Sequence, residues 1–134
     1  MLQLTRTVTA AEILALHTTP FTLIPAPGAG RTLILLGAVA RLKFGGTAYA
    51  NGGDVVASVG PLANGIEPFA VMGNGPMTAG ADQIESTTPT TPAFAGAAAS
   101  FDNQDCELKN DGAAFITGNS TLAVTVFYSI GITQ

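Results

Sequence analysis

The strongest constraint on the fold is an alternation of residue types in the stretch TLAVTVFYSI at residues 121–130. Successive side chains of a β-strand point to opposite faces, so a repeat of two residues indicates a strand with one buried face. The apolar face carries Leu122, Val124, Val126, Tyr128 and Ile130, and the opposite face carries Thr121, Thr125 and Ser129. One apolar and one polar face are typical of a strand in an antiparallel sheet.

Other strand-sized segments precede it, separated by glycine-rich turns. Residues 33–40 are apolar on both faces, which predicts a strand covered on both sides, and Gly37 within it predicts a bulge or a close backbone crossing. The sequence NGGD at residues 51–54 predicts a hairpin turn before the strand VVASV at 55–59. We therefore expect an all-β antiparallel β-sandwich or jelly roll with a short N-terminal helix, in one domain of 134 residues.

The first 30 residues differ from the rest in pattern. Thr9 and Glu12 have the spacing of a capping box, which predicts a two-turn helix that must dock on its own domain or on a neighbour. The segment FTLI at 21–24 is flanked by prolines and is predicted to be an edge strand, and PAPGAG at 25–30 a rigid elbow. We expect residues 1–30 to form a partly extended docking segment.

Charge is scarce. Charged residues make up 10% of the chain and hydrophobic ones 47%, against about 25% charged in a typical soluble domain. Such a surface predicts an obligate oligomer or a protein seated on a larger assembly. The net charge of −4 and five scattered basic residues argue against nucleic acid as a partner. No apolar run is long enough for a membrane helix, and the first ten residues lack the pattern of a signal peptide, which predicts no membrane partner and a cytosol-like compartment.

Few residues qualify for chemistry. Cys106 is the single cysteine and is predicted to be a small buried thiol, and His17, the single histidine, to cap the carbonyls at the end of the helix. The glycines of PAPGAGRT and of GNG at 73–75 lack the lysine, the hydroxyl and the following helix of a phosphate loop. We expect no enzymatic activity and no cofactor.

An acidic segment, DNQDCELKND at 102–111, allows two interpretations. Asp102, Asp105 and Glu107 could offer oxygen ligands to calcium or magnesium. The spacing does not match a calcium loop, so we favour a solvated loop and edge strand kept soluble by its charge.

Two stretches, LHTTPFTLIPAPGAGRTLILLGAVARLKFGGTAYANGGDV and LKNDGAAFITGNSTLAVTVFYSI, resemble a group of small virion proteins of tailed bacteriophages. The resemblance covers about the first 55 and the last 25 residues and leaves out residues 60–100, and Arg31 stands where many members have lysine. It implies a capsid decoration (cement) protein of the jelly-roll type, often a homotrimer, made in the host cytoplasm and seated on the capsid surface of the virion. The implied partners are the major capsid protein and further copies of this chain.

The predicted interface lies in the docking segment and its elbow. Its candidate residues are Ile13, Leu16, His17, Phe21, Pro25, Pro27 and Arg31. An alternative is a tail, fibre or baseplate module that binds host glycan through residues 64–77, with Phe69, Asn64 and Asn74 as candidates. An enzyme on a jelly roll is the weakest alternative, because metal-dependent members of that class need several histidines.

Overall fold

A computed structural model describes residues 1–60, 69–89 and 98–133 of the chain. These residues form an all-β fold with antiparallel strand pairing. The strands are β1 (Leu2–Val8), β2 (Phe21–Ile24), β3 (Arg31–Lys43), β4 (Ala50–Asn51), β5 (Val55–Val59), β6 (Phe69–Met72), β7 (Gln83–Thr87), β8 (Cys106–Asn110), β9 (Phe115–Ile116) and β10 (Thr121–Ile132). The helices are α1 (Ala10–Ala15), α2 (Asn74–Met77) and the 3-10 turn η2 (Ala98–Ser100). Within the described residues, no helix is long and apolar enough to cross a membrane.

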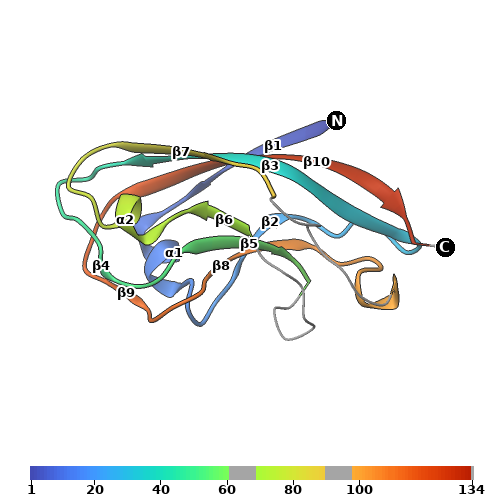
Figure 1. Ribbon diagram of the computed structural model, residues 1–134. Helices are drawn as coiled ribbons and strands as arrows, with labels where there is room; N and C mark the ends of the chain where they lie inside the picture. Colours follow the sequence, from blue (N-terminus) through green and yellow to red (C-terminus); the bar gives the residue numbers. More distant parts are fainter. Residues whose placement is uncertain (61–68, 90–97, 134) are drawn as a thin grey trace.

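The described strands form two four-stranded sheets and a two-stranded one. One large sheet has the order β1-β10-β3-β7, the other has β2-β8-β5-β6, and β4 pairs with β9. The two large sheets lie one above the other, with β10 and β3 spanning the length of the molecule (Figure 1). The alternation at 121–130 thus belongs to β10, which lies between β1 and β3.

The centre of β3 contains the predicted bulge. The register of β3 on β10 shifts where Phe127 pairs with Gly37 and Tyr128 with Leu35, so that Leu36 is the extra residue. A Cβ atom on Gly37 would lie 3.0 Å from the carbonyl oxygen of Thr87 on β7. Gly37 therefore lies next to the bulge and also at a close approach between the backbones of β3 and β7.

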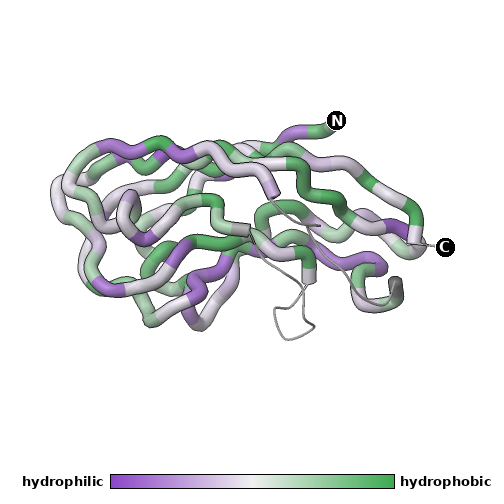
Figure 2. The backbone as a smooth tube through the Cα atoms, viewed as in Figure 1, coloured by the Kyte–Doolittle hydropathy of each residue, from purple (hydrophilic) through white to green (hydrophobic). Residues whose placement is uncertain are grey.

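The hydrophobic core lies between the two large sheets. One sheet contributes Leu122, Val124 and Val126 of β10, and the other contributes residues such as Val55 and Leu108. Figure 2 shows this distribution as hydrophobic stretches along β5, β6 and one half of β3. The period-two prediction for residues 121–130 is confirmed at the first three apolar positions, while Ile130 is exposed at the end of the sheet.

The N-terminal 30 residues are part of the fold. Residues 2–8 form β1, which pairs with β10 over its whole length. The capping box is confirmed: Glu12 N donates to Thr9 Oγ1, and Thr9 N donates to Glu12 Oε2 at 2.8 Å. Ile13 and Leu16 then insert into the core of the same chain, so the helix docks on its own domain. The segment FTLI is an edge strand, β2, as its flanking prolines predict.

The NGGD turn is not a hairpin. Asn51 and Gly52 have φ of 62° and 83°, the left-handed values that an Asn-Gly turn adopts. The strands on either side nevertheless separate, because β4 pairs with β9 and β5 pairs with β6 and β8. Pairing with distant segments replaces the local hairpin.

Candidate interaction surface

A group of solvent-exposed apolar side chains on the β1-β10-β3-β7 sheet lies on the side away from the core. We call this surface the outer face and define its apolar part by Ile34, Leu36, Val39, Ile84 and Phe127. Because paired residues share a face, the pairing of Phe127 with Gly37 and of Ile84 with Arg41 places strands β10, β3 and β7 on one continuous surface. The exposed fractions are 36% for Ile34, 41% for Leu36 and 63% for Ile84. This corrects the prediction that residues 33–40 are covered on both sides.

Neither described α-helix covers the outer face. Helix α1 buries Ile13 in the core and α2 buries Met77 there, on the other side of the sheet. The alternation of β3 changes phase at the bulge, which brings both Leu36 and Val39 to the outside while Leu35 and Ala38 point inward. Strand β3 thus leaves Ile34, Leu36 and part of Val39 available to another molecule.

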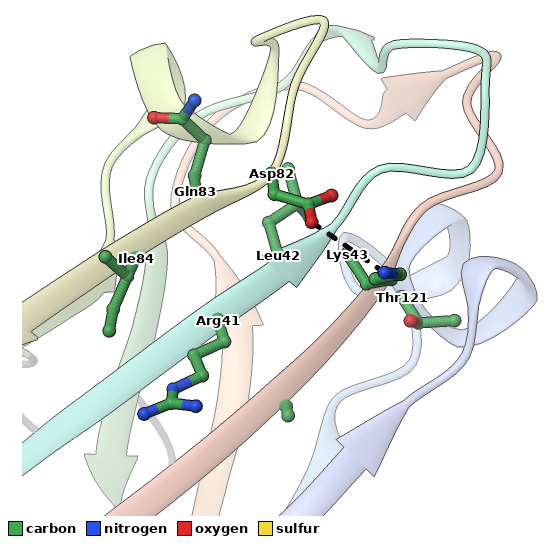
Figure 3. A pocket seen from close by; sticks show the side chains of 8 residues that line it. Arg41, Leu42, Lys43, Asp82, Gln83, Ile84 and Thr121 are labelled. Atoms are coloured by element: carbon green, nitrogen blue, oxygen red, sulfur yellow. Dashed lines mark ion pairs between the residues drawn. The ribbon is translucent and has the colours of Figure 1, made fainter.

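One end of the outer face is charged and hollowed. Arg41, Lys43, Asp82 and Ile84 line a shallow depression of about 610 Å³. Figure 3 shows Arg41 and Ile84 on neighbouring strands, with Lys43 and Asp82 joined as an ion pair. The pair spans 3.8 Å and is well exposed, so it adds little to stability. Asp82 Oδ1 also accepts from the backbone N–H of Phe44 at 2.8 Å, which positions the carboxylate.

A second hollow lies at the edge of the same sheet. Residues of β1 and of the proline elbow enclose a groove of about 440 Å³, which we call the edge groove. Its lining includes Leu4, Arg6, Pro25, Pro27 and Tyr128. The Nε of Arg6 donates to the carbonyl of Leu23 at 3.4 Å, so this guanidinium bridges the two layers.

The predicted interface residues fall into two groups. Ile13 and Leu16 are fully buried in the chain's own core and offer no surface to a partner. The other five, which are exposed or half-buried, are His17, Phe21, Pro25, Pro27 and Arg31. Sequence reasoning missed Ile34, Leu36 and Ile84. The signal for the first two was the apolar run at 33–40, which was interpreted as a fully covered strand.

His17 does not cap the helix. The carbonyl of Ala15 accepts instead from the backbone N–H groups of Thr18 at 3.0 Å and Thr19 at 2.7 Å. His17 is exposed beside this turn. Backbone donors three and four residues beyond the last helical residue are already close enough to satisfy the carbonyl, so no side chain is required.

The acidic segment is dispersed by the fold. Asp102 Oδ1 accepts from Thr133 Oγ1 at 2.7 Å, Asp105 Oδ2 accepts from Thr22 Oγ1 at 3.4 Å, and Glu107 pairs with Lys109 at 3.2 Å. Across residues 1–60, 69–89 and 98–133, no group of three or more His, Cys, Asp or Glu side chains could hold a metal ion. The edge-strand prediction for this segment is wrong, because β8 lies between β2 and β5.

Two other carboxylates fix the turn before α2. Asp54 Oδ1 accepts from the N–H of Asn74, and Glu85 Oε2 accepts from the N–H of Gly73, both at 2.8 Å. Contrary to the prediction, a helix begins within the GNG sequence, at Asn74, but it has only four residues. Because its first amides already bind carboxylates of the same chain, they are not available to an outside anion.

Cys106 is buried, as predicted. Burial, with Asp105 and Glu107 beside it, raises the pKa of the Cys106 thiol to about 12. A thiol with such a pKa stays protonated near neutral pH and is a poor nucleophile.

Tyr49 is a buried polar residue that sequence reasoning did not single out. Its hydroxyl donates to the carbonyl of Ser120 at 2.6 Å, and burial raises its pKa to about 12. The ring packs 5.6 Å from that of Phe115, centroid to centroid, and a Cβ on Gly118 would overlap it. The residue closes one end of the core.

The glycan-binding alternative finds little of its site in the described residues. Asn64 lies outside them, and Phe69 begins β6. Asn74 donates its side-chain amide to the carbonyl of Asn51 at 3.1 Å, which ties it to a neighbouring turn.

Comparison with protein-family models, curated proteins and solved structures found no match for this chain.

Proposed function

We propose that this chain is a structural virion protein that decorates and stabilises a bacteriophage capsid through protein contacts. The observation that carries the proposal is the apolar outer face, which extends across three strands and has no cover from the described helices. Large exposed apolar patches mark interaction sites rather than free surface. The resemblance of residues 16–55 and 108–130 to small phage virion proteins indicates that the assembly bound by this face is a phage virion.

The proposed architecture is a jelly roll. In a jelly roll one long antiparallel hairpin is wound into two sheets, so the first strand pairs with the last and the pairs nest inward. The pairs β1 with β10, β2 with β8, β3 with β7 and β5 with β6 nest in this way. They alternate between the two large sheets, which supports a jelly roll over other two-sheet folds.

The mechanism we propose is contact area alone. If each subunit buries about 1,500 Å² on its neighbours and the shell, apolar transfer at about 25 cal/mol per Å² gives tens of kcal/mol gross. Most of this is offset by the cost of association and ordering. Repetition over the capsid then adds avidity, and a homotrimer would present three outer faces at once.

A matched pair of variants tests the proposal on purified expanded capsids. Ile84→Asp places a charge on the outer face, and Ile116→Asp places the same charge at β9, away from it, where the wild-type side chain is 54% exposed. We expect Ile84→Asp to weaken capsid binding at least tenfold in co-sedimentation, because it places a charge in an apolar contact, and Ile116→Asp to bind as wild type does. Failure of the wild-type chain to bind capsids, or its location on the tail in images of the particle, would overturn the proposal.

A further inference from the structure

The free edge of β1 is the longest one open to an additional strand. The strands at the edges of the two large sheets are β1, with seven residues, β7, with five, and β2 and β6, with four each. Proline flanks β2 on both sides, whereas β1 contains no proline and is exposed over most of its length. Proteins usually block such edges, because unpaired backbone groups attract other strands.

The hydrogen-bond phase shows which residues of β1 face outward. Thr133 N donates to the carbonyl of Gly30 at 3.1 Å, so odd-numbered residues of β10 direct their amides to β3. Even-numbered residues of β10 therefore bond to β1, and they pair with Leu2, Leu4, Arg6 and Val8. The remaining residues of β1, which are Gln3, Thr5 and Thr7, direct their N–H and C=O groups to the free edge.

The edge groove lies beside this row of free backbone groups. Leu4 and Arg6 point from β1 toward the core side, and Pro25 and Pro27 face them from the elbow. A strand added to β1 would direct every second side chain into the space between them. The lining is mostly apolar, so these side chains should be apolar as well.

Charge identifies one further property of the occupant. The described ion pairs join Lys43 with Asp82 and Lys109 with Glu107, and none involves Arg6. A charged side chain such as Arg6, which points inward at a sheet edge, disfavours pairing with any strand that cannot neutralise the charge. A carboxylate on the added strand would neutralise it and could accept two parallel hydrogen bonds from the guanidinium.

We propose that an extended segment of a partner chain adds to the free edge of β1 and fills the edge groove with apolar side chains flanking an Asp or Glu that pairs with Arg6. Strand addition gives affinity through the backbone, and the groove gives specificity through alternate side chains. On a capsid, the segment would come from the major capsid protein, and this identification rests on the proposed function.

The first test uses a synthetic peptide, TVTETVT, capped at both ends. Its sequence reads the same in both directions, so it presents Val, Glu and Val to the groove whether it adds parallel or antiparallel. We expect amide shifts in NMR spectra to centre on Gln3, Thr5 and Thr7, and the charge-reversed peptide TVTKTVT to bind at least tenfold more weakly. Equal binding of the two peptides, or shifts centred on the outer face, would overturn the proposal.

Backbone and charge variants separate this site from a change in folding. Thr5→Pro removes an outward N–H without breaking the β10 ladder, and Ser86→Pro does the same on β7, at the opposite edge of the sheet. We expect Thr5→Pro to abolish peptide binding and Ser86→Pro to preserve it, with both variants folded by circular dichroism. Arg6→Glu should reverse the preference, so that TVTKTVT binds more tightly than TVTETVT; an unchanged preference would contradict the role of Arg6.

Capsid binding distinguishes the two proposals. If wild type binds capsids and Thr5→Pro does not, while Ser86→Pro does, both stand. If Thr5→Pro binds capsids as wild type does and the peptide fails to bind, strand addition is wrong and the capsid proposal survives. If the free chain dimerises in sedimentation analysis and Thr5→Pro makes it monomeric, the edge pairs with a second copy, and the proposed partner strand is wrong.

Discussion

The outward sides of β5 and β3 differ although both strands are rich in apolar residues. All five residues of β5 are buried, including Val56 and Ser58, which point away from the core between the sheets. On β3, Ile34 and Leu36 point away from the core and are exposed. Apolar composition therefore identified both as strands but did not show which had a covered outer side.

Part of the cover over β5 comes from a charged pair. Val56 pairs with Lys109 and Ser58 with Glu107, so these side chains share one side of the sheet. Lys109 and Glu107 form an ion pair with side-chain exposures of only 14% and 25%. The aliphatic part of a lysine covers apolar surface while its ammonium group keeps a polar partner. On the outer face the charges lie at one end, and the centre is left for another molecule.

The largest expected effect comes from placing a carboxylate on each of these two sides. Val56→Asp buries a charge and should lower the free energy of unfolding by roughly 3–5 kcal/mol, whereas Leu36→Asp should change it by about 0.5 kcal/mol or less. Urea unfolding followed by circular dichroism measures both. Similar losses in the two variants would mean that the outer face is covered in the free chain.

The two faces of β3 can be compared at adjacent residues. Leu35 is buried in the core and Leu36 is exposed on the outer face. Replacing each leucine by alanine therefore tests one face of the strand at a time. Leu35→Ala should cost about 2–4 kcal/mol through lost burial and a cavity. Leu36→Ala should cost less than about 1 kcal/mol. The difference in urea midpoint at constant slope checks the prediction; a larger loss at Leu36 would place the bulge elsewhere.

A pH titration tests how well the sheet containing β5 excludes water. The folded pKa of Cys106 is raised from 9.0 to about 12, so the folded state retains the proton while the unfolded state loses it. Stability from this group is complete below about pH 9 and is lost as the pH rises toward 12. We expect the stability of wild type to fall more steeply than that of Cys106→Ala between pH 9 and 10, where Tyr49 contributes little. Parallel slopes would indicate that the thiol is hydrated.

The smallest effect is expected at a pair of threonines that face each other on strands β1 and β10. Thr5 and Thr125 share a hydrogen bond of 2.8 Å between exposed hydroxyl groups. Because water replaces this bond readily, Thr125→Val should change the free energy of unfolding by less than about 0.5 kcal/mol. Thermal unfolding of the variant beside wild type measures it, and a loss above 1 kcal/mol would show that water does not reach the pair.

Much of the candidate surface was beyond sequence reasoning. The low charge content predicted an interface, yet none of the seven residues chosen for it belongs to the apolar part of the outer face. Five of them are exposed or half-buried between residues 17 and 31, and two lie in the core. Leu36 reaches the outer face because a bulge shifts the phase of β3, and Ile84 because β7 pairs with β3 over a separation of more than 40 residues. Neither the phase shift nor the pairing of β7 with β3 can be read from the pattern of neighbouring residues.

The sequence by itself determined the local features: the alternation of β10, the capping box of α1, the bulge at Gly37, the proline-flanked edge strand β2 and the buried thiol of Cys106. Each depends on backbone geometry or side-chain chemistry within a few residues. Only the tertiary structure decided that the NGGD strands separate, that the acidic side chains disperse, and that β5 is covered where β3 is open. These depend on pairing between distant segments, as β1 pairs with β10 across about 120 residues, and such pairing is set by burial of the whole core.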